Sequence, residues 1–217
     1  MARAAADRQL APAASRTRDG IAVARRDDDA DLRALLRRVE TPGSVGVAFT
    51  REPDYFRGEG LAGALDQTVV FRTEGALSGM ARLSIQSLHR NGLPQSIGYL
   101  GELRLAPEAP RRPRILRDGF ELLRSAVVEH GVSGCYTSIA ADNARARSVL
   151  EHGRRLGLPS YLPLAELVTL LVPVGRSGRA ERREPRGASV DRDELTSFLS
   201  RHARAAQLAP TWDAARW

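Results

Sequence analysis

Residues 98–120 read GYLGELRLAPEAPRRPRILRDGF, and this sequence combines three local signals in a fixed order. Its first part predicts a strand that ends at Ala106-Pro107. An arginine-rich turn follows, and from Ile115 apolar residues recur with the spacing of a helix. The free N–H groups and the dipole at the start of a helix both favour a bound phosphate. The order strand, basic turn and helix therefore indicates a site for a phosphorylated ligand.

The sequence on either side of residues 98–120 predicts further strands and helices. Apolar residues recur there at strand or helix spacing, and glycine, proline and asparagine mark the turns. The expected strands are residues 21–24, 67–73, 77–88, 97–105, 135–140, 161–164 and 166–174. The expected helices are residues 29–39, 51–56, 115–128, 143–150 and 191–207. This order indicates an α/β (α+β) fold, in which helices flank a mixed, mostly antiparallel central sheet.

The composition sets the domain organisation. The chain has 217 residues, 42% of them hydrophobic, which is enough to bury the core of one ordinary domain. We expect a mobile N-terminal arm at residues 1–18 and a folded domain at 19–175. A charged linker at 176–190 and a C-terminal helix and tail at 191–217 complete the chain.

The basic residues are all arginines, and they are concentrated in one place. The formal net charge is +7, and no lysine occurs in the sequence. Five arginines against Glu108 give +4 within residues 104–117 alone. A guanidinium binds phosphate oxygens in a bidentate manner, so this concentration favours a multiply phosphorylated ligand over nucleic acid. A solvated, charged helix is the competing interpretation.

Several classes of protein are not expected. Cys135 is the only cysteine, so there is no intramolecular disulfide, and the four histidines are too scattered for a metal site. The longest largely apolar run, residues 167–174, is too short to span a membrane. The N-terminal residues lack the apolar segment of a secretory signal. We therefore expect a metal-free cytoplasmic protein that binds neither membranes nor nucleic acid.

A family resemblance adds to these signals. The strand with Leu103-Arg-Leu-Ala-Pro107, the basic turn, the apolar helix and then Asn143-Ala-Arg-Ala146 resemble the acyl-CoA-binding core of the GNAT N-acetyltransferase superfamily. The resemblance covers residues 21–174. It implies an acyltransferase that moves an acetyl group from acetyl-CoA, its co-substrate, to a primary amine of a small molecule or a protein by direct attack.

The basic turn departs from the pattern of that family. The pattern has Gln or Arg, two residues, Gly, one residue, and then Gly or Ala. With Arg111 in the first position, Arg114 and Leu116 stand where the small residues belong, and Pro113 has no N–H to donate. An arginine-rich turn can still bind phosphate through its side chains.

The resemblance also implies roles for individual residues. Glu102 would accept a proton from the acceptor amine, and Tyr161 would protonate the departing thiolate. Tyr55 and Phe56 would line the acceptor pocket. Acetyl-CoA would be bound by Leu103, Arg104, Leu105, Arg111, Arg112, Arg114, Ile115, Leu116, Arg117 and Asn143.

Each of these roles has a plainer alternative. Glu102 would be a salt-bridged strand residue, Asn143 a helix N-cap, and the three aromatic residues core packing. A second function also stays open, namely a non-catalytic domain of this fold that binds acyl-CoA or a protein partner. The acceptor and the oligomeric state, a homodimer included, are not determined by the sequence.

Overall fold

The computed structural model describes residues 20–39, 49–61, 63–109, 112–168 and 191–212. The chain divides into two compact units, one of residues 1–88 with 94–162 and the other of residues 89–93 with 163–217. The expected arm at 1–18 and the expected linker at 176–190 lie outside the described residues.

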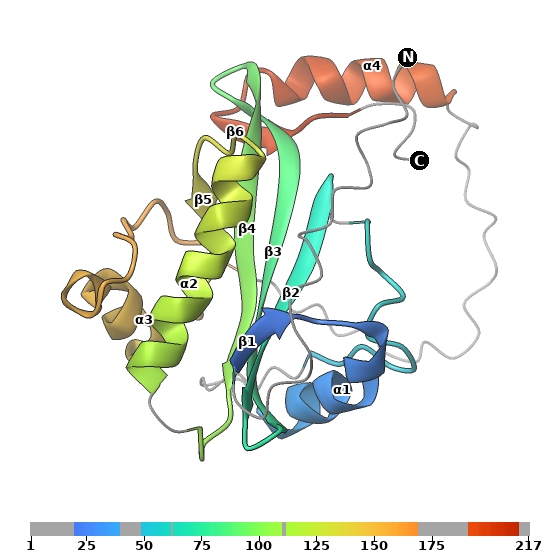
Figure 1. Ribbon diagram of the computed structural model, residues 1–217. Coiled ribbons are helices and arrows are strands. Elements are labelled where there is room, and N and C mark those ends of the chain that lie inside the picture. The colour runs from blue at the N-terminus through green and yellow to red at the C-terminus, as the bar shows by residue number, and fades with distance from the viewer. Residues whose placement is uncertain (1–19, 40–48, 62, 110–111, 169–190, 213–217) are drawn as a thin grey trace, which may run out of the picture. The chain divides into compact units, whose positions relative to one another are not determined.

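A mixed sheet forms the centre of the first unit (Figure 1). Its strands are β1 (Gly20–Val23), β2 (Leu65–Thr73), β3 (Ala76–Arg90), β4 (Leu93–Leu105) and β5 (Cys135–Tyr136). They are ordered β1-β2-β3-β4-β5, with β1 and β3 antiparallel to β2 and with β5 parallel to β4. The predicted mixed, mostly antiparallel sheet is confirmed.

Two tight turns join the long strands. Glu74 and Gly75 connect β2 to β3 with φ angles of +51° and +79°. Asn91 and Gly92 connect β3 to β4 with φ angles of +52° and +81°. Two consecutive residues with positive φ make the type I′ turn, whose twist suits an antiparallel hairpin. The Asn-Gly and Gly75 signals in the sequence are therefore confirmed as hairpin turns.

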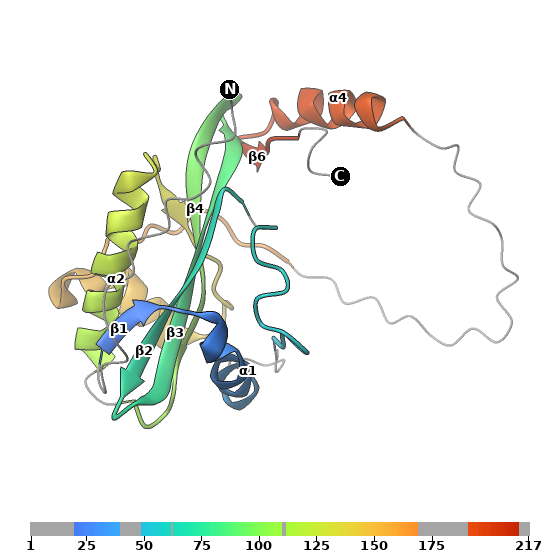
Figure 2. The same cartoon turned by 45° about the vertical axis from the view of Figure 1, so that its right-hand side comes forward.

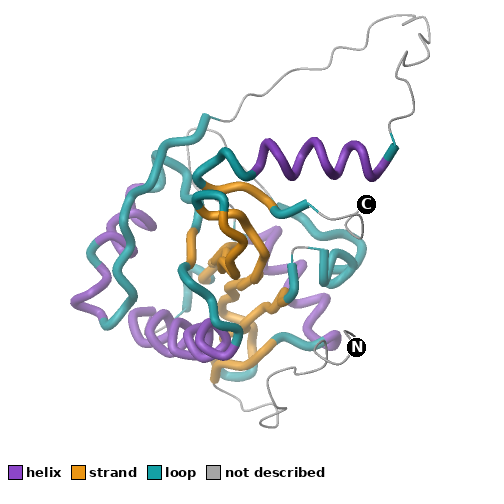
Figure 3. Tube along the Cα trace, turned by 90° about the horizontal axis from the view of Figure 1, so that it is seen from above, coloured by secondary structure: helices purple, strands orange, loops and turns teal. Residues whose placement is uncertain are grey.

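Helices cover both faces of this sheet. Helix α1 (Asp29–Arg38) lies on one face, and α2 (Arg112–Glu129) lies on the other (Figure 2). Seen from above, strands of the first unit lie between these helices (Figure 3). After β5 come α3 (Ala144–Glu151) and the short 3-10 helix η2 (Gly153–Leu156), and another 3-10 helix, η1 (Arg26–Asp28), precedes α1.

Alternation along β2 and β3 divides the core into two clusters. Val70 and Met80 pack with Leu32 and Leu36 of α1, whereas their neighbours Val69 and Ala81 pack with residues of α2. Successive side chains of a strand point to opposite faces, so one apolar strand serves both clusters. The buried, uninterrupted apolar run in β2 follows from this arrangement.

After residue 162, the described part of the second unit contains one helix and one short strand. Helix α4 (Arg192–Ala203) begins after Asp191, whose side chain accepts from the N–H groups of Asp193 and Glu194. Strand β6 (Leu208–Pro210) pairs with β3, and the N–H of Asn91 donates to the carbonyl of Gln207 at 2.9 Å. The C-terminal helix is confirmed, and β6 was not expected from the sequence.

The expected short helix at residues 51–56 is wrong. Residues 55–61 form successive turns instead, with hydrogen bonds between residues three apart. Two N–H groups are taken by side chains, because Asp29 accepts from Tyr55 and Asp54 accepts from Phe56, both at 2.7 Å. Aspartate oxygens that satisfy these donors compete with the helical hydrogen-bond ladder.

The strands expected after residue 134 are shorter than predicted or absent. Strand β5 has two residues, where six were expected. Residues 161–168, the described part of the two closing strands, contain no strand. Pro163 cannot donate to a ladder, and Leu162, Leu164, Leu167 and Val168 are more than four-fifths exposed. Apolar composition indicated strands there, but no partner in the described part of the chain covers these side chains.

No helix in the described ranges is long and apolar enough to cross a membrane.

Candidate functional site

A bulge in β4 determines where Glu102 points. Glu102 has a φ of +51°, which lies in the left-handed region that is uncommon for a residue with a side chain. The buried core residues that pack with α2 are Val69, Phe71, Ala81, Leu83, Ile85, Leu123 and Ala126, and we call them the α2 cluster. Leu100 and Leu103 are three positions apart and yet both pack against this cluster. In an unbroken strand, residues at an odd spacing point to opposite faces, so the irregularity at Glu102 shifts the alternation by one residue. Glu102 consequently lies on the α1 face.

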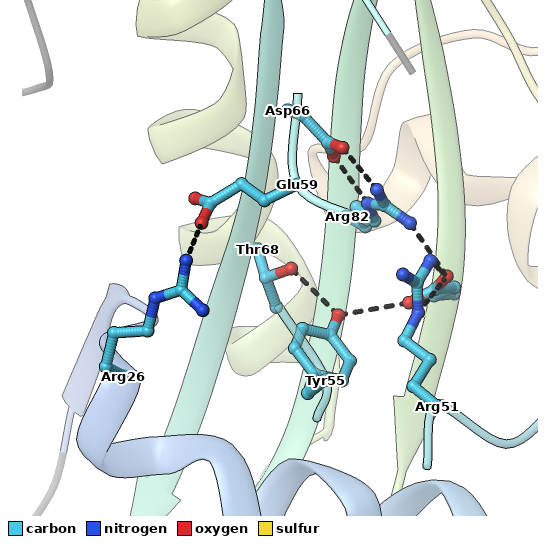
Figure 4. A network of polar contacts seen from close by, with 8 residues as sticks. Arg26, Arg51, Tyr55, Glu59, Asp66, Thr68 and Arg82 are labelled. Carbon is cyan, nitrogen blue, oxygen red and sulfur yellow. Dashed lines mark hydrogen bonds and ion pairs between the residues drawn. The ribbon is translucent and has the colours of Figure 1, made fainter. Parts of the chain in front are cut away.

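The carboxylate of Glu102 is held by three side chains, those of Arg51, Tyr55 and Arg82, which are labelled in Figure 4. Its Oε1 accepts from Arg51, with Nε at 3.1 Å, and from Nη1 of Arg82 at 3.2 Å. Its Oε2 accepts from the hydroxyl of Tyr55 at 3.0 Å. The side chain is 19% exposed. The salt-bridged arrangement, which was one of the two interpretations of Glu102 from sequence, is therefore present.

Tyr55 continues this network into the core. Its hydroxyl lies 2.8 Å from Oγ1 of Thr68, and the guanidinium of Arg51 lies 5.1 Å from the centre of its ring. Burial and then the charge of Glu102 raise the pKa of Tyr55 well above its usual value. The phenol therefore stays protonated and can donate to the carboxylate.

Arg82 links Glu102 to a second carboxylate. Arg82 donates from Nε to Oδ1 of Asp66 at 2.5 Å and from Nη2 to Oδ2. The Asp66 side chain is 2% exposed, and burial raises its pKa to about 6. We call Arg51, Tyr55, Asp66, Thr68, Arg82 and Glu102 the Glu102 cluster. Its two guanidiniums balance its two carboxylates, so it is a preformed polar group with little net charge.

Tyr161 lies with the α2 face of the sheet. Its ring packs edge-on against Phe120 of α2, with ring centres 6.2 Å apart. Burial and then nearby Cys135 raise its pKa well above the usual value. Cys135 pairs with Gly98, where a Cβ would lie 2.6 Å from Sγ of Cys135 and 3.3 Å from Leu83 of the α2 cluster. No described contact joins Tyr161 to the Glu102 cluster, which faces α1.

Among the described residues, β5 covers only part of the outer edge of β4. Strand β5 pairs with β4 only at Gly98 and Tyr99. From Leu100 to Leu105, the described part of the chain offers no strand to that side of β4. Backbone N–H and C=O groups along such an edge can pair with an extended ligand that carries amides.

A hollow lies at the start of α2. It has a volume of about 460 Å³ and is lined by Pro113, Arg114, Arg117, Arg155, Leu156 and Gly157. Arg114 and Arg117 are 65% and 58% exposed, and each lies near Asp118, at 3.4 and 3.5 Å. An exposed, arginine-lined hollow of this kind suits an anion better than an apolar ligand.

Known proteins resemble this chain in structure but not detectably in sequence. No protein family matches the sequence, and no curated protein does. A mutant of the BH1408 protein from Bacillus halodurans superposes with a TM-score of 0.51 at 19% identity, covering 70% of this chain and 99% of that one. A candidate acetyltransferase from Agrobacterium tumefaciens superposes with a TM-score of 0.50 at 11% identity, covering 69% and 99%. The chain has the GNAT acetyltransferase fold.

A third structure in this comparison has a lower TM-score. It is ribosomal-protein-alanine N-acetyltransferase from Brucella melitensis, at a TM-score of 0.47 and 15% identity, covering 72% of this chain and 99% of that one. At such identities the likeness concerns the fold, so the activity has to be argued from the site.

The GNAT fold places the remaining predicted residues as follows. Leu103 and Leu105 pack half-buried against the α2 cluster, and burial lowers the pKa of Arg104. Ile115 packs on the same cluster and Leu116 is 8% exposed, so both side chains face the core. Their backbone, not their side chains, is what a ligand could reach. Arg111 and the side chain of Arg112 lie outside the described residues.

Phe56 is a core residue. The ring of Tyr55 also belongs to the core, whereas its hydroxyl belongs to the Glu102 cluster. Their side chains are 8% and 3% exposed, and their rings meet edge to face at 5.0 Å. Asn143 acts as the N-cap of α3, where its side chain accepts from the N–H of Ala146 at 3.1 Å. Contact between Asn143 and acetyl-CoA stays a prediction, since one asparagine can serve both purposes.

Sequence reasoning missed four side chains that the fold brings to these sites: Arg51, Asp66, Arg82 and Arg155. Arg82 carried a signal, because it is a charged residue inside an otherwise apolar strand and therefore needs a buried partner. Arg51 and Arg155 carried no such signal, because neither lies in a segment with the periodicity of a strand or an α-helix. No group of three metal-ligating side chains occurs among the described residues.

Proposed function

We propose that this protein is an acyl-CoA-dependent N-acyltransferase that transfers an acetyl group from acetyl-CoA to a primary amine. The observation that carries the proposal is Glu102 in the bulge of β4, held by Arg51, Arg82 and Tyr55, with an arginine-lined hollow at the start of the next helix. The GNAT fold supports the same reaction.

The residues present fit acetyl-CoA. The backbone of Leu103 to Leu105 would pair with the amides of the pantetheine arm. Arg114 and Arg117, together with Arg111 and Arg112, would hold phosphates through their side chains. Bound acetyl-CoA supplies a thioester that a neutral amine can attack directly, so no covalent enzyme intermediate is needed.

Glu102 would accept the proton of the acceptor amine. Among the described residues, Oε1 of Glu102 accepts from both Arg51 and Arg82, whereas Oε2 accepts from Tyr55 alone. A carboxylate oxygen has two lone pairs, so one remains on Oε2. This lone pair is where a proton would arrive, directly or through a water molecule. Protonation of the thiolate by Tyr161 stays a prediction, because its ring packs against Phe120 and no described contact joins it to the Glu102 cluster.

The test of this mechanism is the pH dependence of Glu102→Gln. Thiol release from acetyl-CoA is followed with a panel of small amines and amino-terminal peptides. We expect kcat/KM to fall by about 100-fold or more, most strongly at low pH, where the amine is largely protonated. The control is Glu121→Gln, which changes an exposed carboxylate on α2. A pH profile in Glu102→Gln that equals the control would remove Glu102 from the mechanism.

The second candidate is a non-catalytic domain of the GNAT fold. Two observations favour it: Glu102 is already engaged by two arginines, and Arg114 and Leu116 replace the small residues of the turn. Such a domain would bind acetyl-CoA and show no thiol release with any amine. Turnover therefore separates the two candidates.

A further inference from the structure

The α1 face of β2 and β3 changes from apolar to charged along the two strands. Val70 pairs with Met80, and both belong to the core beneath α1. Two residues further along this face, Thr68 pairs with Arg82. Asp66, two residues before Thr68, lies diagonally across from Arg82, which is within the reach of a long side chain. The strand register thus places a carboxylate beside a guanidinium on this face.

The guanidinium of Arg82 is shared between two carboxylates (Figure 4). Nε and Nη2 donate to the two oxygens of Asp66, with Nε at 2.5 Å from Oδ1, and Nη1 donates to Oε1 of Glu102 at 3.2 Å. A contact of two parallel hydrogen bonds fixes the plane of a guanidinium. Asp66 therefore determines the direction in which Nη1 of Arg82 points, and through it the place of the Glu102 carboxylate.

This arrangement is shielded from solvent. The side chain of Asp66 is almost fully buried, and those of Arg82 and Glu102 are less than one-fifth exposed. Charges that are buried are screened much less by water and salt than charges on the surface. The charge of Asp66 consequently acts on both neighbours more strongly than a surface carboxylate would.

The charge of Asp66 also affects how readily Glu102 accepts a proton. Oε1 of Glu102 accepts from both Arg51 and Arg82. A nearby cation stabilises an ionised carboxylate and so makes it a weaker base, and a weaker base is a less effective proton acceptor in catalysis. Ionised Asp66 offsets the charge of Arg82. If Asp66 were neutral, two guanidiniums would act on Glu102 without that compensation.

We propose that Asp66 is a positioning residue for the transfer reaction: its carboxylate orients Arg82 and offsets its charge, so that Glu102 stays fixed and basic. This inference rests on the proposed function, in which Glu102 accepts the proton of the amine. Asp66 acts through Arg82 and in its ionised form.

The protonation of Asp66 falls in a pH range that kinetic measurements can reach. The titratable and charged groups that act on Asp66 or Glu102 are Arg82 on β3, Arg104 on β4, and Arg51, Tyr55 and Glu59 in the segment before β2. Burial raises the pKa of Asp66 to about 6. The backbone N–H of Gly60 and the charge of Arg51 oppose this increase, whereas the charges of Glu102 and Glu59 add to it. Asp66 is therefore ionised at about pH 8 and largely protonated at about pH 5.

The test compares Asp66→Asn with the wild type in the full chain at several pH values. Asparagine keeps the shape of aspartate without its charge, so the variant resembles the protein with Asp66 protonated. The amine is protonated to the same extent in both assays, so the ratio of the two kcat/KM values isolates the effect of Asp66. We expect thiol release from acetyl-CoA to have a kcat/KM about tenfold below the wild type at about pH 8 but only about twofold below it at about pH 5.

Asp31→Asn is the matched control. It removes a carboxylate from another aspartate–arginine pair, with Arg72 at 3.4 Å, in which Asp31 is 56% exposed. This variant should keep the wild-type kcat/KM at each pH. A ratio for Asp66→Asn that does not change with pH would mean that Asp66 contributes only to folding, and it would overturn the proposal.

A second measurement depends neither on Asp66→Asn nor on turnover. In ¹³C-labelled wild-type protein without ligand, the carboxyl resonance of Glu102, identified by its absence from Glu102→Gln, should shift as Asp66 titrates at about pH 6. A Glu102 resonance that does not respond to Asp66 overturns the inference, whether or not thiol is released. If it responds and no amine gives thiol release, the coupling of Asp66 to Glu102 stands and the acyltransferase proposal falls.

Discussion

The hydroxyl of Tyr55 joins a strand residue of β2 to the bulge of β4, although Tyr55 belongs to neither strand. It contacts Thr68 at 2.8 Å and Glu102 at 3.0 Å, and the residue is 3% exposed. When a buried hydroxyl with two partners is removed, each partner loses one hydrogen bond.

Tyr55→Phe should therefore destabilise the protein by about 1–2 kcal/mol, as measured by urea unfolding. The matched control is Tyr99→Phe, whose hydroxyl bonds the exposed Ser138 at 2.8 Å and which should cost no more than about 0.5 kcal/mol. Equal effects of the two changes would show that the Tyr55 hydroxyl contributes nothing to the Glu102 cluster beyond a surface hydrogen bond.

Arg82 is the second residue whose loss affects a buried partner, because Asp66 would lose its paired guanidinium. Arg82→Met keeps most of the stem but removes the two hydrogen bonds to Asp66, whose side chain is 2% exposed. Breaking such a pair from one side should cost about 3 kcal/mol or more. Arg124→Met is the control, because Arg124 is 71% exposed and its ion pair with Glu121 is a surface one.

The pH dependence of this effect has a definite sign. Burial raises the pKa of Asp66 from 3.8 to about 6, so the folded protein holds this proton more tightly than the unfolded chain does. The corresponding contribution to stability is complete below pH 3.8 and is lost as the pH rises through about 6. Arg82→Met removes the cation that faces the ionised form. The loss of stability in this variant should thus be larger at about pH 8 than at about pH 5, and the reverse order would contradict the assignment.

At the scale of elements, the pairing of β4 with β5 depends on the absence of a side chain at Gly98. A Cβ there would lie 2.6 Å from Sγ of Cys135 and 3.3 Å from Cδ1 of Leu83. Strand β5 is held to β4 at only two residue pairs, so it has little other pairing to compensate for a displacement.

Gly98→Ala should accordingly destabilise the protein by about 2 kcal/mol through overpacking. Cys135→Ala removes the sulfur that the new methyl group would meet. The double variant should then recover at least about 1 kcal/mol relative to the sum of the two single changes. Strict additivity in urea unfolding would mean that Gly98 and Cys135 do not compete for the same space.

The bulge at Glu102 is the other feature that belongs to this scale. It turns β4 so that Leu100 and Leu103 both serve the α2 cluster, and it directs Glu102 toward α1. It also lies in the part of β4 that β5 leaves unpaired. The backbone irregularity at Glu102 thus determines both how β4 packs on the α2 cluster and where the carboxylate of Glu102 points.

At the scale of the whole molecule, the net charge is +7, and arginine is the basic residue throughout because the chain contains no lysine. Exposed charges interact over a distance that salt shortens. If the phosphates of acetyl-CoA are bound by exposed arginines, the dissociation constant should rise on the order of tenfold between about 50 mM and about 500 mM salt.

Calorimetric titration of the wild-type protein at several salt concentrations measures this dependence. Arg114→Gln should have a smaller slope, because it removes one of the guanidiniums proposed to hold phosphate. Arg124→Gln, at an exposed residue of α2 that does not line the hollow, should keep the wild-type slope. A salt-independent affinity for acetyl-CoA would place the binding energy elsewhere, in the backbone edge of β4. The same titration with DNA tests the expectation that the arginines do not bind nucleic acid.

The amino-acid sequence by itself determined the order of the strands β1 to β5 and of the helices α1 to α4, the hairpin turns, the N-cap at Asn143 and the concentration of arginine next to the start of α2. These features depend on residues that are neighbours in the chain, through periodicity, turn conformation and local hydrogen bonds. The tertiary structure alone decided the partners of Glu102, the separation of Tyr161 from it and the place of Arg155. Those contacts join segments tens of residues apart, and they follow from strand order and from the one-residue shift in β4. Neither of these is encoded in any local pattern. The turns at residues 55–61 have the same origin, because the carboxylates of Asp29 and Asp54 accept from backbone N–H groups there. Residues 161–168 form no strand for the opposite reason, since no described strand pairs with them.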